Sequence, residues 1–136
     1  MTRLGRTALP IAFLIFSSLS ALQAQTNPSA DPNSIPVVDA GLGSCSVDFI
    51  TTDEAAKPLY DAKIRVHIAY GFLSAHKLDL EVGTNAAGKA RFTGLPSKTK
   101  QGLFFQASQG DREASAFDDP AKTCKAALTV VLQRKS

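Results

Sequence analysis

Apolar and polar residues alternate along several short stretches from residue 45 onward, and turn-forming residues bound each stretch. In the clearest one, residues 63–70, the apolar positions are Ile64, Val66, Ile68 and Tyr70. Residues two apart on an extended strand share a face, so this alternation predicts a half-buried strand. The same reasoning predicts strands at 45–51, 76–82, 89–93, 103–107, 114–117 and 125–133.

The segments between these stretches contain the residues that turns require. Asn85 and Gly88 occupy the first and fourth positions of a type I turn, and Pro96 ends the strand before it because proline has no N–H to donate. Turns recur about every eight to twelve residues and no long helical period occurs, a rhythm typical of sandwiches. We therefore predict an all-β fold, a small antiparallel two-sheet sandwich of about seven strands.

The first two dozen residues have a different composition. Arg3 and Arg6 precede an apolar run from Ala8 to Phe16, and small residues follow as far as Ala24. This is the layout of a secretory signal peptide, which we assign to residues 1–24. The run falls short of the roughly 20 apolar residues that span a bilayer, which favours cleavage over retention as an anchor. The mature protein is expected to be secreted or periplasmic, with no transmembrane segment.

The next segment, residues 25–43, is rich in Asn, Pro, Ser, Asp and Gly, with Pro28, Pro32 and Pro36 four residues apart. No apolar period runs through it, so we expect a flexible leader. The sandwich domain is then assigned to residues 44–136.

The net charge and the distribution of basic residues argue against a nucleic-acid partner. Loss of Arg3 and Arg6 leaves 13 of the 15 basic side chains against 12 acidic ones, a net charge of +1. The remaining lysines and arginines are scattered along the chain without a dense run. The sequence therefore indicates no nucleic-acid partner and gives no sign of binding to anionic lipid.

The chain has two cysteines, Cys45 and Cys124. An even number in an exported protein favours a disulfide, and the absence of a Cys-x-x-Cys motif argues against a redox role. Cys45 shares its strand face with Val47 and Phe49, while Cys124 shares its face with the apolar positions of the last strand. Both sulfurs are thus expected on the core side, in a disulfide that joins the first of the predicted strands to the last.

Residues 58–66 (Pro-Leu-Tyr-Asp-Ala-Lys-Ile-Arg-Val) and 84–96, which include Gly88-Lys89-Ala90-Arg91-Phe92 and end in Gly94-Leu95-Pro96, resemble the carboxypeptidase regulatory-like domains. The resemblance implies a transthyretin-like (prealbumin-like) β-sandwich that serves as an accessory module. It departs at Ala56 and Asp61, where that family's turn usually carries glycine. The related transthyretin-like hydrolases end in Tyr-Arg-Gly-Ser, whereas this chain ends Gln-Arg-Lys-Ser, so the resemblance does not extend to that enzymatic branch.

Few residues are candidates for chemistry. His67 and His76, with Asp79 or Glu81, could form a weak metal site, although solvated surface histidines are the expected reading. Four acidic residues of the later turns could gather a calcium ion, again without a supporting motif: Asp111, Glu113, Asp118 and Asp119. We therefore expect no catalytic, metal or cofactor residues and no enzyme.

The aromatic residues suggest a contact surface. Phe104 and Phe105 must face opposite ways on a strand, so one of them points outward, where it could pair with Phe72 or Tyr60. We expect a neighbouring loop to bury it. The function predicted from the sequence is an exported, non-catalytic module for protein interaction or assembly in the cell envelope or outside the cell, its partner another envelope or extracellular protein. The alternative is a protein that binds a small ligand such as a carbohydrate or metal.

Overall fold

The computed structural model describes residues 5, 31 and 33–135, so the predicted signal peptide and most of the leader lie outside the described residues. Within these residues, nine strands and one short 3₁₀ turn occur in the order β1 (Val37–Asp39), β2 (Cys45–Thr52), β3 (Lys63–Tyr70), η1 (Phe72–Ser74), β4 (His76–Gly83), β5 (Lys89–Leu95), β6 (Leu103–Gln109), β7 (Arg112–Asp118), β8 (Lys125–Val131) and β9 (Gln133–Arg134). The described chain includes no helix of the length and apolarity that a membrane crossing needs.

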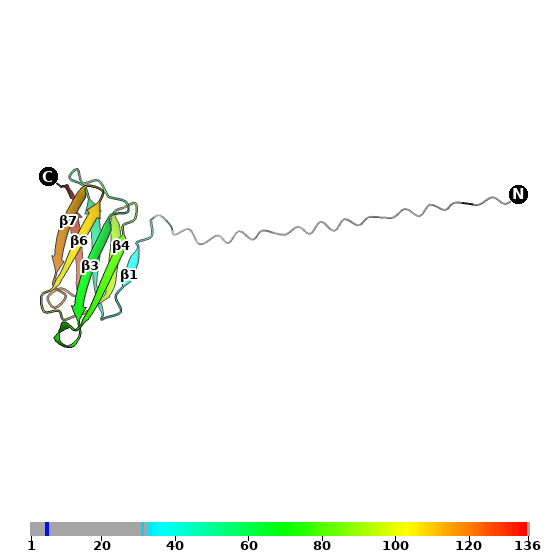
Figure 1. Ribbon diagram of the computed structural model, residues 1–136. Coiled ribbons are helices and arrows are strands. Elements are labelled where there is room, and N and C mark those ends of the chain that lie inside the picture. The colour runs from blue at the N-terminus through cyan, green and yellow to red at the C-terminus, as the bar shows by residue number, and fades with distance from the viewer. Residues whose placement is uncertain (1–4, 6–30, 32, 136) are drawn as a thin grey trace.

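The strands form two sheets that pack face to face (Figure 1), so the predicted all-β sandwich is confirmed. One sheet has four strands in the order β1-β5-β2-β8, and the other has five in the order β4-β3-β6-β7-β9. Most neighbours are antiparallel, as expected. Two pairs in the four-stranded sheet, β1 with β5 and β2 with β8, are parallel instead, because both partners run in the same direction between the ends of the sandwich.

Three phenylalanines from both sheets fill the middle of the core. The rings of Phe49 and Phe92 in the four-stranded sheet have centroids 5.8 Å apart, and Phe105 from the facing sheet lies 4.8 Å from Phe49 and 5.3 Å from Phe92. All three are at most 1% exposed. The period-two prediction for these strands is therefore correct, since the alternate residues that it assigned to the core are the ones that pack there.

The two cysteines lie at bonding distance at one end of the sandwich. Cys45 is the first residue of β2, Cys124 immediately precedes β8, and their sulfur atoms are 2.09 Å apart. Because β2 and β8 are parallel neighbours, both strands leave this end of the sheet in the same direction. The two cysteines are 79 residues apart in sequence, so the loop that they close contains nearly the whole sandwich.

Part of the segment expected to be a leader belongs to the sandwich. Residues 37–39 form β1, which pairs with β5 at the edge of the four-stranded sheet. Two further contacts hold the chain just before it: Asn85 Nδ2 donates to the carbonyl of Ser34 at 3.1 Å, and the Pro36 carbonyl accepts the N–H of Arg91. The sequence did not reveal this strand, because three residues are too few to show a period and nearby prolines usually mark a loop. Proline is nevertheless tolerated at a sheet edge, which is where β1 lies.

One turn requires its glycine. Gly88, at the end of the turn that begins at Asn85, has a φ of +73°, and a Cβ atom there would lie 2.3 Å from the carbonyl oxygen of Thr51. The Gly88 carbonyl in turn accepts the N–H of Thr51 at 2.7 Å. This close approach ties the turn before β5 to the end of β2.

Candidate functional site

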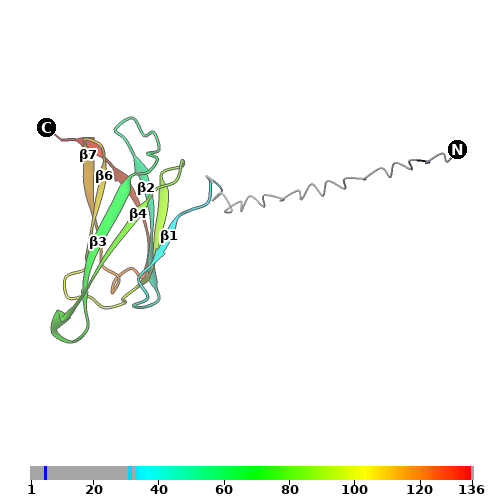
Figure 2. The same ribbon diagram turned by 45° about the vertical axis from the view of Figure 1, so that its right-hand side comes forward.

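The strands β3 and β6 separate halfway along the five-stranded sheet. β3 pairs with β4 over its whole length, Lys63 to Tyr70, but with β6 only from Lys63 to Val66. Beyond Val66, none of the described residues pairs with that side of β3. The outer half of the β3–β4 hairpin therefore leaves the sheet as a two-stranded ribbon that extends past the neighbouring loops (Figure 2).

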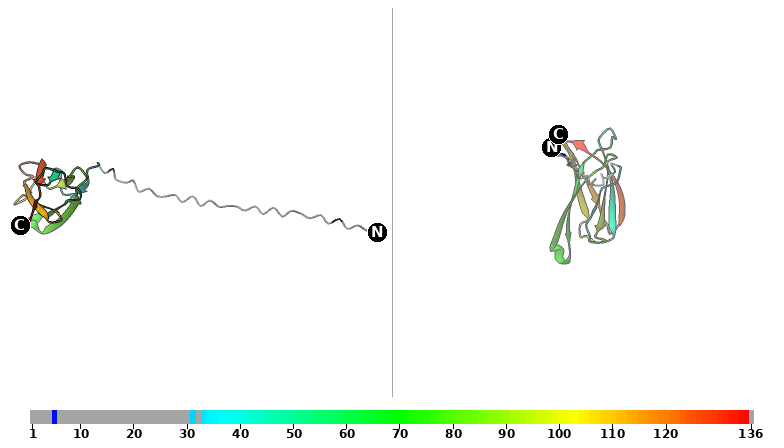
Figure 3. Two further views of the ribbon diagram at one scale, coloured as in Figure 1. Left: turned by 90° about the horizontal axis from the view of Figure 1, so that it is seen from above. Right: turned by 90° about the vertical axis from the view of Figure 1, so that its right-hand side faces the viewer.

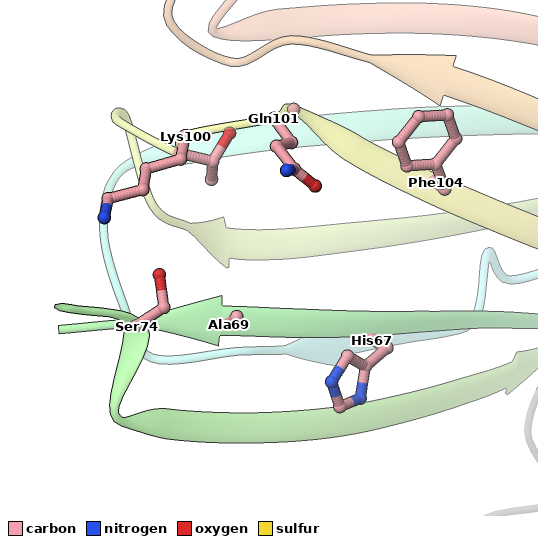
Figure 4. Close-up of a pocket in the computed structure, with 8 residues that line it drawn as sticks. His67, Ala69, Ser74, Lys100, Gln101 and Phe104 are labelled. Atoms are coloured by element: carbon pink, nitrogen blue, oxygen red, sulfur yellow. The ribbon is translucent and has the colours of Figure 1, made fainter.

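A depression of about 460 Å³ lies where the two strands part. Its hairpin side is formed by His67, Ala69 and Ser74, and its other side by residues 99–102 and Phe104. Figure 4 shows Ser74, Ala69 and His67 along the hairpin and Lys100, Gln101 and Phe104 across the space from them. The lining is thus one aromatic ring among charged and neutral polar groups, a mixture suited to recognition.

Two cross-strand side-chain pairs of the hairpin lie on the outer face of the sheet. Arg65 bonds Glu81, and His67 Nδ1 lies 2.5 Å from the Asp79 carboxylate, because these residues are opposite one another in the register of β3 and β4. Their side chains alternate with the buried Ile64, Val66 and Ile68 and so must point outward. Asp79 holds the imidazole in one orientation, which leaves the other ring nitrogen of His67 available to hydrogen-bond a ligand.

An exposed aromatic pair continues this face. Phe104 of β6 lies opposite Phe117 of β7, with ring centroids 4.9 Å apart. The side chains are 61% and 51% exposed, so the prediction that a loop would bury the outward-facing phenylalanine was wrong. The expected partners, Phe72 and Tyr60, are elsewhere: Phe72 is at the hairpin tip and Tyr60 in the loop before β3.

A second depression, of about 570 Å³, adjoins the first and shares His67 and Phe104 with it. It is lined further along the sheet by Arg65, Glu81 and Gln106. We call the surface formed by both depressions and the Phe104–Phe117 pair the outer-face site. It carries charge, hydrogen-bonding groups and exposed aromatic area on one side of the protein.

The candidate metal sites of the sequence analysis are not assembled among the described residues, which contain no group of three or more His, Cys, Asp or Glu side chains able to hold an ion. His67 pairs with Asp79, whereas the ring of His76 stacks on Tyr70 nearer the tip, 5.4 Å between centroids. The four acidic residues of the possible calcium site lie at opposite ends of β7, two beside its start and two beside its end: Asp111, Glu113, Asp118 and Asp119.

One acidic group near the site is buried. Asp118, the last residue of β7, is 6% exposed, and its Oδ2 atom has no hydrogen-bond partner. Burial, reinforced by the neighbouring negative charge of Asp119, raises the pKa of this carboxyl above its ordinary value. The folded state therefore favours the neutral acid. The contribution of Asp118 to the free energy of unfolding is fully present below the pKa that this carboxyl has in the unfolded chain. It is lost as the pH rises through the higher pKa that the carboxyl has in the folded protein.

We expect Asp118→Asn to raise the melting temperature near neutral pH, because the amide is neutral and removes a buried charge. The gain should shrink toward zero as the pH falls below the ordinary aspartate pKa, where Asp118 is protonated in both states. Thermal unfolding followed from acidic to neutral pH measures this difference. Asp111→Asn, at the exposed turn before β7, is the matched control and should show no such pH-dependent gain.

Two parts of the site were not predicted from the sequence: Phe117 and the loop residues 99–102. The signal for Phe117 was present: the turn at Gly110 and Asp111 joins two antiparallel strands, and counting outward from that turn places Phe104 opposite Phe117. No comparable signal placed Lys100 and Gln101 beside His67. Their position depends on where β3 and β6 part, which a local pattern does not specify.

No protein family matches this sequence, and no curated protein matches it. Among solved structures, 3-chlorocatechol 1,2-dioxygenase from Rhodococcus opacus 1CP has a TM-score of 0.49 at 12% identity over 74% of this chain and 64% of its own. Chlorocatechol 1,2-dioxygenase from Pseudomonas putida has a TM-score of 0.48 at 11% identity, covering 75% of this chain and 68% of its own. The mercury-inhibited catechol 1,2-dioxygenase from Acinetobacter sp. ADP1 has a TM-score of 0.44 at 11% identity, over 76% and 60%.

These findings correct the expectation that the chain is not an enzyme. The solved structures to which the chain is similar are catechol and chlorocatechol dioxygenases, which are enzymes. The likeness transfers neither their reaction nor their substrates to this chain, since fold does not imply function and the identity is 11–12%. The resemblance to carboxypeptidase regulatory-like domains is supported only at the level of a β-sandwich fold.

Proposed function

We propose that this protein is an exported interaction module that binds another protein of the cell envelope or the extracellular space through the outer-face site. The observation that carries the proposal is the separation of β3 from β6 beyond Val66, which leaves one side of β3 without a strand partner beside an exposed aromatic pair. Both features are of the kind that protein recognition uses.

The unpaired side of β3 favours an extended partner segment. A strand without a neighbour presents backbone N–H and C=O groups that an added strand can bond, and pockets beside it then select side chains. The depression next to His67 and Ala69 is such a pocket. Lys100 in this depression and the Arg65–Glu81 pair in the adjoining one supply the charges that orient a partner.

The Phe104–Phe117 pair supplies the apolar contact. Aromatic residues are enriched at the energetically important centres of protein interfaces, where polar neighbours exclude water around them. Here the rings project from the middle strands of the sheet, with His67 and Gln106 beside Phe104. A partner that covers the rings would bury apolar area that the isolated protein leaves in water.

The family proposed for this module is that of the carboxypeptidase regulatory-like domains. The sequence departs from that family at Ala56 and Asp61, where its turn usually has glycine. Both residues have a positive φ, 62° and 56°, a conformation that costs a non-glycine residue roughly 1–2 kcal/mol. The backbone thus has the conformation that glycine favours at both positions, which supports the resemblance despite the two substitutions.

Site-specific photo-crosslinking tests the proposed function. A benzophenone side chain placed at Ala69, beside the open side of β3, is expected to form a covalent adduct with one protein of the envelope or culture medium. The same probe at Thr129, exposed on β8 of the other sheet, is the matched control and should give no adduct. Adding Phe104→Ser to the Ala69 probe should abolish the adduct while circular dichroism shows an intact fold.

Equal adducts from the two probe positions would contradict the proposal, because contact would then not depend on the outer-face site. An Ala69 adduct that survives Phe104→Ser would remove the aromatic pair from the interface. The absence of any protein adduct at Ala69 would also overturn the proposal and leave the second candidate described next.

A small polar ligand, such as a carbohydrate, is the second candidate. The depression of about 460 Å³ is within the size range of ligand pockets, and the polar groups around Phe104 could orient a sugar-sized molecule. Thermal unfolding with a panel of soluble oligosaccharides distinguishes this function from the first. A ligand at about 100 times its Kd should stabilise the protein by about 2.7 kcal/mol, and His67→Ala should remove the effect.

A further inference from the structure

The tip of the β3–β4 hairpin presents two apolar side chains to solvent. Phe72 is 85% exposed and Leu73 is 73% exposed, which makes them the most exposed large hydrophobic residues among those that the structure describes. The tip projects beyond the body of the sandwich, as the right-hand view of Figure 3 shows. Two adjacent apolar residues at such a position contribute nothing to the core.

The backbone at the tip holds these side chains outward at a conformational cost. Leu73 and the next residue, Ser74, both have a positive φ, 56° and 54°, although neither is a glycine. Strained conformations of this kind persist where the surrounding structure enforces them and are concentrated at functional sites. The hairpin here rests on the stacked rings of Tyr70 and His76 immediately behind the tip.

Lysines from four separate segments surround this end of the sandwich. They come from the start of β4, the loop between β5 and β6, the loop between β7 and β8, and the start of β8, and all are exposed: Lys77, Lys98, Lys100, Lys122 and Lys125. Lys100 lines the depression together with Ser74 of the tip. These lysines are scattered in the sequence because they are distant from one another along the chain, and only the fold brings them to one end.

The acidic residues at this end do not neutralise the lysines. Asp39 and Asp119 each accept an N–H of their own loop, from Gly41 at 2.8 Å and Ala121 at 3.0 Å, and these two carboxylates stand against five lysines. Asp118 is buried and its raised pKa disfavours the charged form. The charges that face solvent around the tip are therefore mainly positive.

We propose that this end of the protein docks on an anionic phospholipid surface, with Phe72 and Leu73 inserted among the lipids and the lysines against the phosphate groups. An exposed apolar tip surrounded by cationic side chains matches the two layers of a membrane surface, the hydrocarbon boundary and the charged headgroups. The charge complementarity favours lipid over an apolar protein groove. Ser74 and Lys100 border both surfaces, whereas Phe104 and Phe117 of the outer-face site lie on β6 and β7 and are not part of the tip.

Co-sedimentation with vesicles tests this proposal, using the protein isolated after export. The wild type is expected to sediment with phosphatidylcholine vesicles that contain phosphatidylglycerol, and much less with phosphatidylcholine alone. Phe72→Ser should weaken partitioning about tenfold, the effect of withdrawing one large apolar side chain from the lipid. Lys98→Gln and Lys100→Gln should each weaken it about fivefold, and added salt should weaken the wild type.

Tyr60→Ser is the matched control, since Tyr60 is 66% exposed at the opposite end of the sandwich and its loss should leave vesicle binding unchanged. Phe104→Ser, which disrupts the outer-face site, should also leave it unchanged, so failure of the proposed function and failure of the lipid proposal are distinguishable. Equal sedimentation of Phe72→Ser and wild type would overturn the proposal. The proposal would also be overturned if the wild type did not sediment with anionic vesicles while a photo-crosslinking probe at Leu73 formed an adduct with a protein.

Discussion

Replacing both cysteines, Cys45→Ala with Cys124→Ala, is expected to lower the free energy of unfolding by on the order of 4 kcal/mol. The disulfide closes a loop with a sequence separation of 79 residues, so its loss releases a large amount of conformational freedom in the unfolded chain. Domains of this size are stable by only about 5–15 kcal/mol, so the change is a large share of the total. Equilibrium unfolding in denaturant measures it.

The single variant Cys45→Ala should lose about as much stability as the double variant, because either change removes the same bond. Reductant provides the internal control: it should lower the unfolding midpoint of the wild type and leave that of both variants unchanged. A single variant that unfolds at the wild-type midpoint would mean that the bond is absent or without effect on stability.

Phe105→Ala is expected to cost about 3–5 kcal/mol, the usual range for removing a buried phenylalanine from a well-packed core. Phe105 is 1% exposed and contacts the rings of Phe49 and Phe92, so its truncation leaves a cavity between the two sheets. The midpoint of denaturant unfolding should fall accordingly, with little change in the slope.

The neighbouring residue supplies the matched control. Phe104 is on the same strand and receives the same substitution, but it is 61% exposed and contacts Phe117 on the outer face. Phe104→Ala should therefore cost about 1 kcal/mol or less. Similar losses for the two variants would contradict the assignment of opposite faces and, with it, the exposed aromatic pair of the outer-face site.

Much of the fold could be predicted because its cause is local. Successive side chains of a strand point to opposite faces, so an alternating pattern shows which side of the strand is buried. Such a pattern runs from Ile64 to Tyr70 and includes the apolar positions 90, 92, 103 and 105. The same rule places Cys45 and Cys124 on the core side of their strands. β1 escaped prediction because three residues are too few for a period, and its pairing with β5 joins segments some fifty residues apart.

The candidate site was predictable only in part. His67 was correctly placed on the polar face, and one of Phe104 and Phe105 was expected to point outward. The prediction that a loop would bury this outward-facing residue, Phe104, was wrong. A strand pattern does not show whether a loop covers an outward side chain. The pairing of His67 with Asp79 follows from the hairpin register, whereas the depression beside it depends on where the pairing between β3 and β6 stops.

The sequence by itself determined the all-β class, the inward and outward faces of each strand and the sulfurs on the core side, because these depend on the spacing of neighbouring residues. Only the tertiary structure decided which strands lie side by side, where β3 parts from β6 and that lysines from four segments gather around Phe72 and Leu73. Such groupings depend on contacts between distant parts of the chain. A period of two residues specifies the face of a strand but not its neighbour.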